Sequence, residues 1–246
     1  MPTDDGSSLL RRWRNATDLS LDRLEKRRLD WAAQPESHKA YPDAPRRPLP
    51  RPAPAPANLW SSLDNRRSRR DFTGEAIPLS TLAALLWACQ GVTGRHGPTL
   101  LRTAPSAGAL YPFETYLSLQ AVEGESPCLA HLHLPSFSLE ILREDARGTA
   151  IAQAALGQGF LAQASAVLLW TAVYPRAAWK YGDRALRYLG LDLGHVAQNL
   201  CLAAEALGLG CCPVAAFLDD EVNAILDVDG NQEFAYYLAA IGRRRR

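Results

Sequence analysis

The longest nearly apolar stretch of the chain, LGLDLGHVAQNLCLAAEALGLG, restricts the folds that this sequence can adopt. It covers residues 189–210, which is too long for one strand. A few polar side chains interrupt it, spaced as on one face of a helix: His195, Gln198, Asn199 and Glu205. We therefore predict a long core helix over residues 181–207, buried except for a single polar stripe.

Apolar segments on both sides of this helix predict strands. AVLLWTAV, residues 166–173, is apolar throughout, as expected for a central strand buried on both faces. CCPVAAF and EFAYYLAAIG predict two further strands. Upstream, ETYLSLQAV, CLAHLHLP and FSLEILRE alternate and predict a meander of three short strands. Because helices and strands interleave, we predict an α+β fold with a mixed central sheet packed by helices.

Shorter helices complete the expected fold. LWSSLDNRR predicts a helix from Leu59, and TLAALLWACQ predicts another that Ser80 would cap. The alanine-rich residues 145–164 are also expected to be helical. DEVNAIL predicts a short helix capped by Asp219 or Asp220.

The first 58 residues differ in composition from the rest. Residues 1–41 are polar and charged, with one helix expected near residues 21–29, capped by Asp18 or Ser20. Residues 41–58 contain seven prolines, which favour a polyproline II strap. We expect the strap to lie on its own domain; a recognition segment for another domain is the alternative. The predicted division is an extension over residues 1–58 and one domain over residues 59–246.

Composition excludes several classes of function. The net charge of +1 provides no general attraction for nucleic acid or an anionic membrane. No apolar run reaches the roughly 20 residues that a membrane helix needs, and the first residues do not resemble a secretory signal, so we expect a cytoplasmic protein. The five cysteines have no CxxC spacing and are expected to be buried small hydrophobes; a redox-active Cys211–Cys212 pair is the alternative.

Several well-known catalytic motifs are absent from the sequence. There is no P-loop, no GxGxxG after a strand, no HExxH, no zinc-spaced Cys/His cluster and no GxSxG. His131 and His133 lie on one face of a predicted strand, but a third ligand is missing nearby. We therefore predict no metal site.

The segment RRSRRDF contains four arginines around a serine at a predicted helix-to-loop junction. Guanidinium forks and a hydroxyl can bind a phosphate through charge-assisted hydrogen bonds. A solvated basic turn is the alternative. The C-terminal GRRRR could close over the same phosphate or be a frayed end; Arg243 directly follows the last predicted strand and is the arginine most expected to be held.

The segment PSAGALYP, residues 105–112, is rich in small residues. Glycine and alanine allow the backbone to approach a flat ligand closely, and their N–H groups can meet acceptor atoms. A tight turn without a ligand is the alternative.

The segment WKYGDRALRY contains Lys180, the only lysine after residue 39. It stands between two aromatic residues, with Arg184 and Arg187 nearby. Burial and neighbouring positive charge both lower the pKa of a lysine, so that its neutral amine is available to accept a proton. Tyr181 is a second proton carrier. A surface lysine lying along aromatic rings is the alternative.

Together these segments resemble a known family. R-R-S-x-R-x-F, P-S-A-G-A-L-Y-P, K-Y-G-x-R-x-x-R-Y, L-D-x-G-H-x-x-Q-N-L and A-L-G-L-G occur in order, followed by a C-terminal G-R. The chain is similar, over about residues 29–246, to the SagB-type dehydrogenases, a thiazole-oxidase-like group of the nitroreductase superfamily.

The resemblance implies a nitroreductase-like fold that is dimeric, with FMN at the subunit interface. It assigns the FMN phosphate and ribityl chain to Arg66, Arg67, Ser68 and Arg70, with Arg243 and Arg245 closing the phosphate site. It places flavin against Pro105, Ser106, Ala107, Gly108, Gln198, Pro213, Val214, Ala215 and Ala216. Lys180 and Tyr181 match the catalytic pair of the group.

Three functions are compatible with this resemblance. The first is an FMN-dependent dehydrogenase that oxidises an azoline ring in a peptide-like substrate, which the lysine–tyrosine pair favours. The second is an NAD(P)H-dependent reductase of nitro compounds or quinones. The third is a flavin-binding scaffold subunit that docks a cyclodehydratase partner. A nucleic-acid partner is the least expected.

Overall fold

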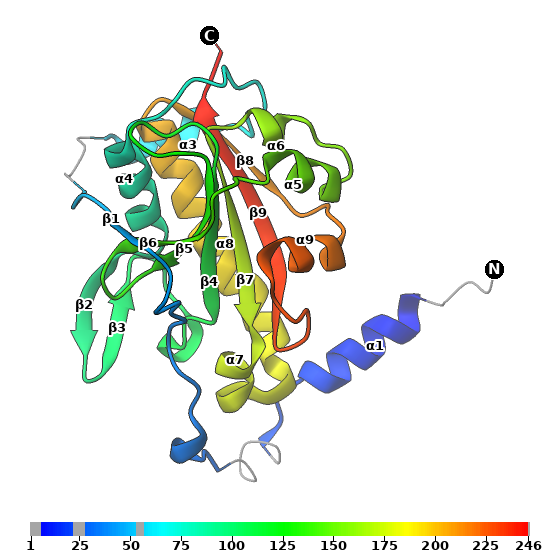
Figure 1. The fold of residues 1–246 in the computed structure, drawn as a ribbon. Coiled ribbons are helices and arrows are strands. Elements are labelled where there is room, and N and C mark those ends of the chain that lie inside the picture. Colours follow the sequence, from blue (N-terminus) through cyan, green and yellow to red (C-terminus); the bar gives the residue numbers. More distant parts are fainter. Residues whose placement is uncertain (1–5, 22–27, 53–56, 246) are drawn as a thin grey trace.

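The structure is a computed structural model that describes residues 6–21, 28–52 and 57–245 (Figure 1). Its centre is a seven-stranded sheet with the order β1-β6-β5-β4-β7-β9-β8. The strands are β1 Arg46–Pro48, β4 Phe113–Leu119, β5 Cys128–His133, β6 Ser138–Arg143, β7 Ala166–Val173, β8 Leu209–Val214 and β9 Glu233–Arg243. The predicted α+β class and the meander of three strands are confirmed.

The prediction of a mixed sheet is wrong, because every ladder among these seven strands is antiparallel. Parallel pairing occurs at isolated bridges, Ser68–Cys211 and Ile77–Val122. The mixed sheet was expected because helices and strands interleave along the chain. However, an antiparallel sheet with helices on both faces also buries both faces of its central strands.

The central strand β7 occupies the predicted residues and divides two hydrophobic cores. Leu168 and Trp170 belong to the core that also contains residues of α4 and α8, and Val167 and Leu169 belong to the other. This separation follows from the alternation of side chains along a strand. All four side chains are fully buried.

Helices cover both faces of the sheet (Figure 1). One face carries α3 (Leu59–Asn65), α4 (Leu79–Gln90) and the long α8 (Ala185–Ala206), and the other carries α5 (Gly148–Ala154), α6 (Phe160–Gln163) and α9 (Asp219–Leu226). The predicted start of the long helix is wrong. The chain forms α7 (Tyr174–Tyr181) and a 3-10 turn, η3 (Gly182–Arg184), before α8 begins, because Gly182 adopts a positive φ of 54°.

The long helix is also less buried than predicted. Leu189 and Leu193 are buried against the sheet, but Leu186 and Leu191 are exposed by 42% and 59%. Gly194, His195 and Gln198 are exposed as well. The helix therefore has an open face that runs along much of its length.

The described part of the N-terminal extension contacts the domain that follows it. Helix α1 (Gly6–Thr17) projects from the body, and the short η1 (Trp31–Ala33) leads into a strap whose residues 46–48 form β1 on β6 (Figure 1). Leu49 enters the main core. The expectation that the strap lies on its own domain is met by its described part. The predicted helix at residues 21–29 falls mostly outside the described residues, and α1 was not predicted.

Local details correct several sequence expectations. Ser80 lies inside α4, whose N-cap is Pro78, and Asp219 and Asp220 lie in the first turn of α9, whose N-cap is Leu218. The hairpin of β2 (Val92–His96) and β3 (Thr99–Arg102) was not predicted, because its side chains are mostly half-exposed and do not alternate clearly.

The five cysteines are free and buried, as predicted. The close pair is Cys201 and Cys211, whose sulfurs lie 3.7 Å apart. None of the helices in the described ranges has the length and hydropathy of a membrane span.

Candidate functional site

The arginine segment that follows α3 is attached to the end of the sheet. Arg69 N–H donates to Cys211 O (2.9 Å), and Ser68 bridges to the same residue of β8. Phe72 is buried, and its ring fills the space over Gly210 and Gly242, where an added Cβ would meet it at 3.0 and 3.1 Å. The two glycines thus allow Phe72 to anchor the segment.

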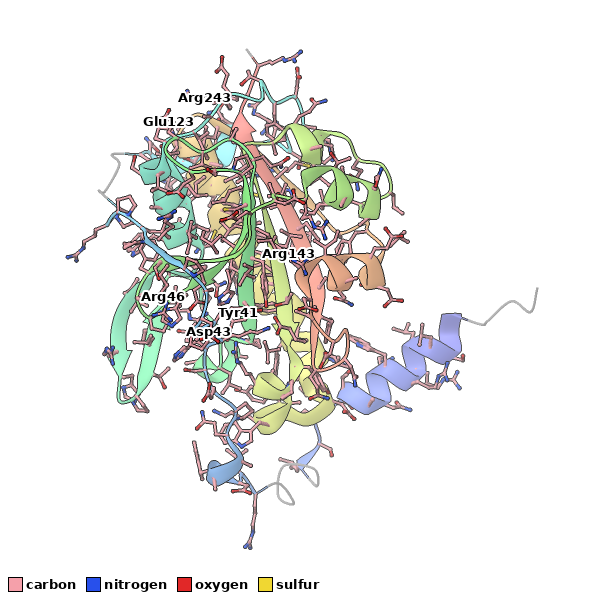
Figure 2. The ribbon with its side chains drawn as sticks, in the orientation of Figure 1. Tyr41, Asp43, Arg46, Glu123, Arg143 and Arg243 are labelled. Carbon is pink, nitrogen blue, oxygen red and sulfur yellow. The ribbon has the colours of Figure 1, made fainter. Side chains whose placement is uncertain are left out.

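The C-terminal residues pack against this segment. Thr73 N–H donates to Arg243 O (2.9 Å), and Arg245 N–H donates to Asp71 O (3.1 Å). Arg243 Nε donates to Ala76 O (2.9 Å), and its side chain lies at the end of the molecule where the chain finishes (Figure 2). The structure therefore brings residues 66–70 and 243–245 together. We call this group the arginine cradle.

The cradle holds more positive charge than its own carboxylates neutralise. Glu205 of α8 lies 3.0 Å from Arg244 and 3.7 Å from Arg69. Within the described ranges, the guanidinium groups of Arg66 and Arg70 have no ion pair. These groups are therefore available to a phosphate, which fits the predicted donor set.

The remaining cradle residues are held less tightly. Arg67 Nη1 donates to Asp64 O and Arg66 O, both at 2.8 Å. Arg245 Nε lies 3.5 Å from Asp71 with both side chains largely exposed, and Ser68 is exposed. These partners are main-chain or solvent-exposed groups, which an incoming anion can replace at little cost.

The small-residue turn at residues 105–112 is positioned by Asp192 of α8. Ser106 Oγ donates to Asp192 Oδ2 (2.6 Å), and Ala107 N–H donates to Asp192 Oδ1 (3.1 Å). Burial raises the pKa of Asp192, while these hydrogen bonds and His195 oppose the rise. Asp192 was not singled out from the sequence, although it belongs to the L-D-x-G-H motif.

The candidate catalytic pair lies against this turn. A Cβ added to Gly108, whose φ is +63°, would lie 2.5 Å from Tyr181 Oη and 3.0 Å from Lys180 Nζ. Only glycine fits both this backbone conformation and this contact. The structure thus brings Gly108, Lys180 and Tyr181 together, with Pro105, Ser106 and Ala107 in the same turn.

Arg184 and Arg187, expected near Lys180, bind helix α1 instead. Arg184 Nη1 donates to Thr17 O (2.9 Å), and Arg187 Nε donates to Thr17 Oγ1 (2.7 Å). The guanidinium of Arg187 also lies 4.4 Å from the Trp13 ring centroid. Their side chains therefore hold the extension.

The structure does not bring the cradle and the Gly108 turn together within one chain. The turn contacts Asp192, near the start of α8, and the cradle contacts Glu205, near its end. At about 1.5 Å per residue these contacts lie about 20 Å apart along the helix. Figure 1 shows the same separation: α7 and α3 lie at opposite ends of the sheet.

The other predicted flavin residues lie between these two ends. Gln198 is exposed on the open face of α8, whereas Asn199 donates to Ala88 O of α4 (3.0 Å). Pro213 and Val214 end β8, and Ala215 and Ala216 are exposed in the loop after it. The predicted polar stripe of α8 therefore faces several different neighbours.

His131 lies in a buried charge cluster rather than in a metal site. Its ring nitrogens lie 2.9 Å from Glu140 Oε2 and 3.0 Å from Glu114 Oε2. Burial would raise the pKa of Glu114, but His131, Arg176 and Arg102 outweigh it and lower the pKa to about 2. Within the described ranges no three His, Cys, Asp or Glu side chains form a metal-binding group.

Comparisons with known proteins give the family. The nitroreductase family profile matches residues 63–243. Putative nitroreductase MJ1384 of Methanocaldococcus jannaschii is 38% identical over 186 residues, which cover 76% of this chain and 91% of that protein. This chain belongs to the nitroreductase family, a family of oxidoreductases whose members typically bind FMN.

Other proteins are similar at lower identity. The trifolitoxin-processing protein TfxB of Rhizobium leguminosarum bv. trifolii is 24% identical over 85% of this chain and 59% of its own length. A putative nitroreductase from Anabaena variabilis superposes with a TM-score of 0.71 at 29% identity, over 83% of this chain and 42% of that one. The Escherichia coli McbBCD microcin synthetase complex, with truncated pro-MccB17 bound, gives a TM-score of 0.61 at 20% identity, over 98% of this chain and 93% of the matched chain.

Proposed function

We propose that this chain is an FMN-dependent dehydrogenase that oxidises an azoline ring to an azole in a peptide-like substrate. The observation that carries the proposal is the contact of Lys180 and Tyr181 with the Gly108 turn. A reductase with a permissive pocket needs no such dedicated proton acceptor. The 24% identity to a trifolitoxin-processing protein also supports a peptide-like substrate.

The cradle and the Gly108 turn would form one flavin site in a homodimer. Two α8 helices packed antiparallel about Gly194 and Gln198 would bring the turn of one copy beside the cradle of the other. The open face of α8 suits this contact, because Leu186 and Leu191 are exposed and Gly190 and Gly194 permit close approach. This arrangement would close the gap of about 20 Å along α8.

The bound flavin would supply an acceptor for the hydride. Conversion of an azoline to an azole removes one hydride and one proton from adjacent ring atoms. Lys180 Nζ as a neutral amine, or Tyr181 Oη as a phenolate, would take the proton. The arginine cradle would hold the phosphate, Gln198 would contact the ring or ribityl chain, and residues 213–216 would line the ring.

A reductase of nitro compounds or quinones is the second candidate, because the relative with 38% identity is named a putative nitroreductase. In that case the flavin would be reduced by NAD(P)H. A scaffold role beside a cyclodehydratase is a further proposal, for which a chain of the same fold in the McbBCD complex is a precedent.

The test compares turnover of a thiazoline-containing peptide by the wild type and by Lys180→Ala, with mass spectrometry detecting the loss of two hydrogen atoms. Arg12→Ala, an exposed change in α1, is the control. We expect Lys180→Ala to keep its flavin and lose turnover by about a hundredfold or more. Full turnover in Lys180→Ala, or brisk NADPH-dependent quinone reduction that this change leaves intact, would contradict the dehydrogenase.

A further inference from the structure

A cavity of about 340 Å³ lies between the extension and the turn that follows Gly108. The extension lines it with Trp31, Pro35 and His38, and the turn lines it with Leu110 and Tyr111. Residues 31–38 precede the segment that matches the nitroreductase family. The extension therefore adds a wall that the matched domain does not supply.

This cavity adjoins the candidate catalytic pair. Tyr111 belongs to the turn whose Gly108 contacts Lys180 and Tyr181. On the extension side, the Trp31 ring lies 5.2 Å from the ring of Trp179, the residue before Lys180. Lys180 and Tyr181 do not line the cavity themselves, but the turn and the Trp31 side chain that line it contact the segment that carries them.

Other cations in this part of the structure form ion pairs with carboxylates. Lys39 pairs with Glu233 at 2.6 Å, and Arg46 pairs with Glu140 at 2.9 Å. Arg176, which also lines the cavity, lies 2.6 Å from Glu114. Each of these cations therefore has its own carboxylate.

Arg102 lines the same cavity and has neutral partners. Its Nη1 donates to Gln90 Oε1 (2.6 Å) and its Nη2 to Ser37 O (3.3 Å). Its Nε is buried and has no hydrogen-bond partner among the described residues. The guanidinium lies 4.5 Å from the Tyr111 ring centroid, which fixes its plane.

Arg102 is half-buried, and no carboxylate of the described residues forms an ion pair with it. An anion that reaches its guanidinium therefore gains a charge-assisted interaction. Burial lowers the pKa of Arg102 to about 10; Glu114 opposes the fall and Arg176 adds to it. The group thus remains a cation at neutral pH. The walls are mixed: apolar side chains such as Trp31 and Leu110 stand beside polar ones and a second cation, Arg176. This lining suits an organic molecule that carries an anionic group.

We propose that this cavity is a substrate subsite in which Arg102 binds a carboxylate. The substrate would then be a molecule whose carboxylate, either a peptide terminus or an acidic side chain, lies close to the ring that reacts. The role of this subsite in the reaction rests on the proposed function of Lys180 and Tyr181. The binding of a carboxylate by Arg102 does not depend on that function.

The experiment titrates the purified full chain with benzoate, and separately with the uncharged benzamide, by isothermal calorimetry. We expect benzoate to bind the wild type, and benzamide to bind about tenfold more weakly or not at all. Arg102→Gln should weaken benzoate binding by about tenfold or more. The matched control is Arg95→Gln, an exposed arginine of the same hairpin, and it should bind benzoate like the wild type.

Two further variants separate this subsite from the other sites. Arg70→Ala should keep benzoate binding, because the cradle is a different anion site, and Lys180→Ala should keep it whether or not turnover is lost. The subsite is refuted if the wild type fails to bind benzoate or if it binds benzamide equally well. It is also refuted if Arg70→Ala abolishes benzoate binding while Arg102→Gln does not. If Arg102→Gln does not fold, the benzoate–benzamide comparison on the wild type decides.

Discussion

At the scale of single residues, the charge cluster around His131 shows how the extension is attached. Glu114 accepts the Lys39 N–H (2.7 Å), Glu140 accepts the Tyr41 N–H (3.1 Å), and Arg176 Nε donates to Glu36 O (2.6 Å). Such buried groups need every partner, because removing one leaves the others desolvated and unpaired. Residues of β4, β6 and α7 therefore hold residues 36–41 of the extension, which include the cavity-lining Ser37 and His38.

Because the pKa of Glu114 is low in the folded protein, the free energy of unfolding should decrease at acidic pH. Its folded-state pKa of about 2 lies below its ordinary value of 4.5, so the ionised form stabilises the fold above about pH 4.5 and this contribution is lost as the pH falls toward 2. Glu114→Gln should lower the free energy of unfolding by about 3 kcal/mol at neutral pH. Denaturant titrations at several pH values would measure both effects. A variant as stable as the wild type would contradict the account of the cluster.

Because Gly108 contacts Lys180 and Tyr181, we predict that a substitution at Gly108 lowers turnover without loss of flavin binding. Gly108→Ala would push a methyl group into Lys180 and Tyr181 and would strain a backbone with positive φ. We expect lower turnover with flavin absorbance retained. The control is Gly97→Ala, which has a similar φ and open space around it. Equal turnover in the two variants would show that the position of the pair does not matter.

Sequence patterns could predict many of the candidate site residues, because those residues occur in recognisable motifs. Lys180, Tyr181 and Gly108 were all named in advance, and the structure brings them together. Asp192 and Arg102 were missed for a physical reason. Their roles depend on what is buried beside them, and neither composition nor spacing shows which charged side chain lacks a partner.

At the scale of elements, α1 is held mainly through its last turn. Thr17 is buried and accepts from Arg184 and Arg187, while Leu9 and Leu10 are exposed. Thr17→Val keeps the shape but removes the acceptor for Arg187 Nε. We expect faster amide hydrogen exchange in α1 without a change in the sheet. Exchange that stays at the wild-type rate would mean that other contacts hold the helix.

Some helices and strands were predicted more accurately than others. β7 and β9 were placed almost to the residue, because long apolar runs bounded by polar residues leave few alternatives. The break between α7 and α8 was missed because the helical pattern continues across Gly182, although its positive φ ends α7. β1 was missed because its three exposed residues join the sheet through backbone pairing with β6, which side-chain pattern does not reveal.

At the scale of the whole molecule, the proposed site requires two copies. Leu191→Asp places a charge on the open face of α8 and should disfavour a dimer formed there. We expect the variant to elute as a smaller species and to lose flavin at the same time. Leu156→Asp, an equally exposed leucine on the other side of the sheet, is the control. A Leu191→Asp variant that stays dimeric would contradict the proposed interface.

Flavin retention by the cradle is the most direct test of the central claim. Arg243 and Arg143 are both exposed arginines, but Arg243 lies in the cradle at the end of the chain and Arg143 lies away from it, in front of the sheet (Figure 2). The measurement is the visible absorbance spectrum and the FMN dissociation constant of the purified wild type, Arg243→Ala and Arg143→Ala. We predict a yellow wild type, FMN affinity reduced about tenfold or more by Arg243→Ala, and no change with Arg143→Ala. A colourless wild type that cannot take up FMN, or equal affinity in all three proteins, would contradict the account.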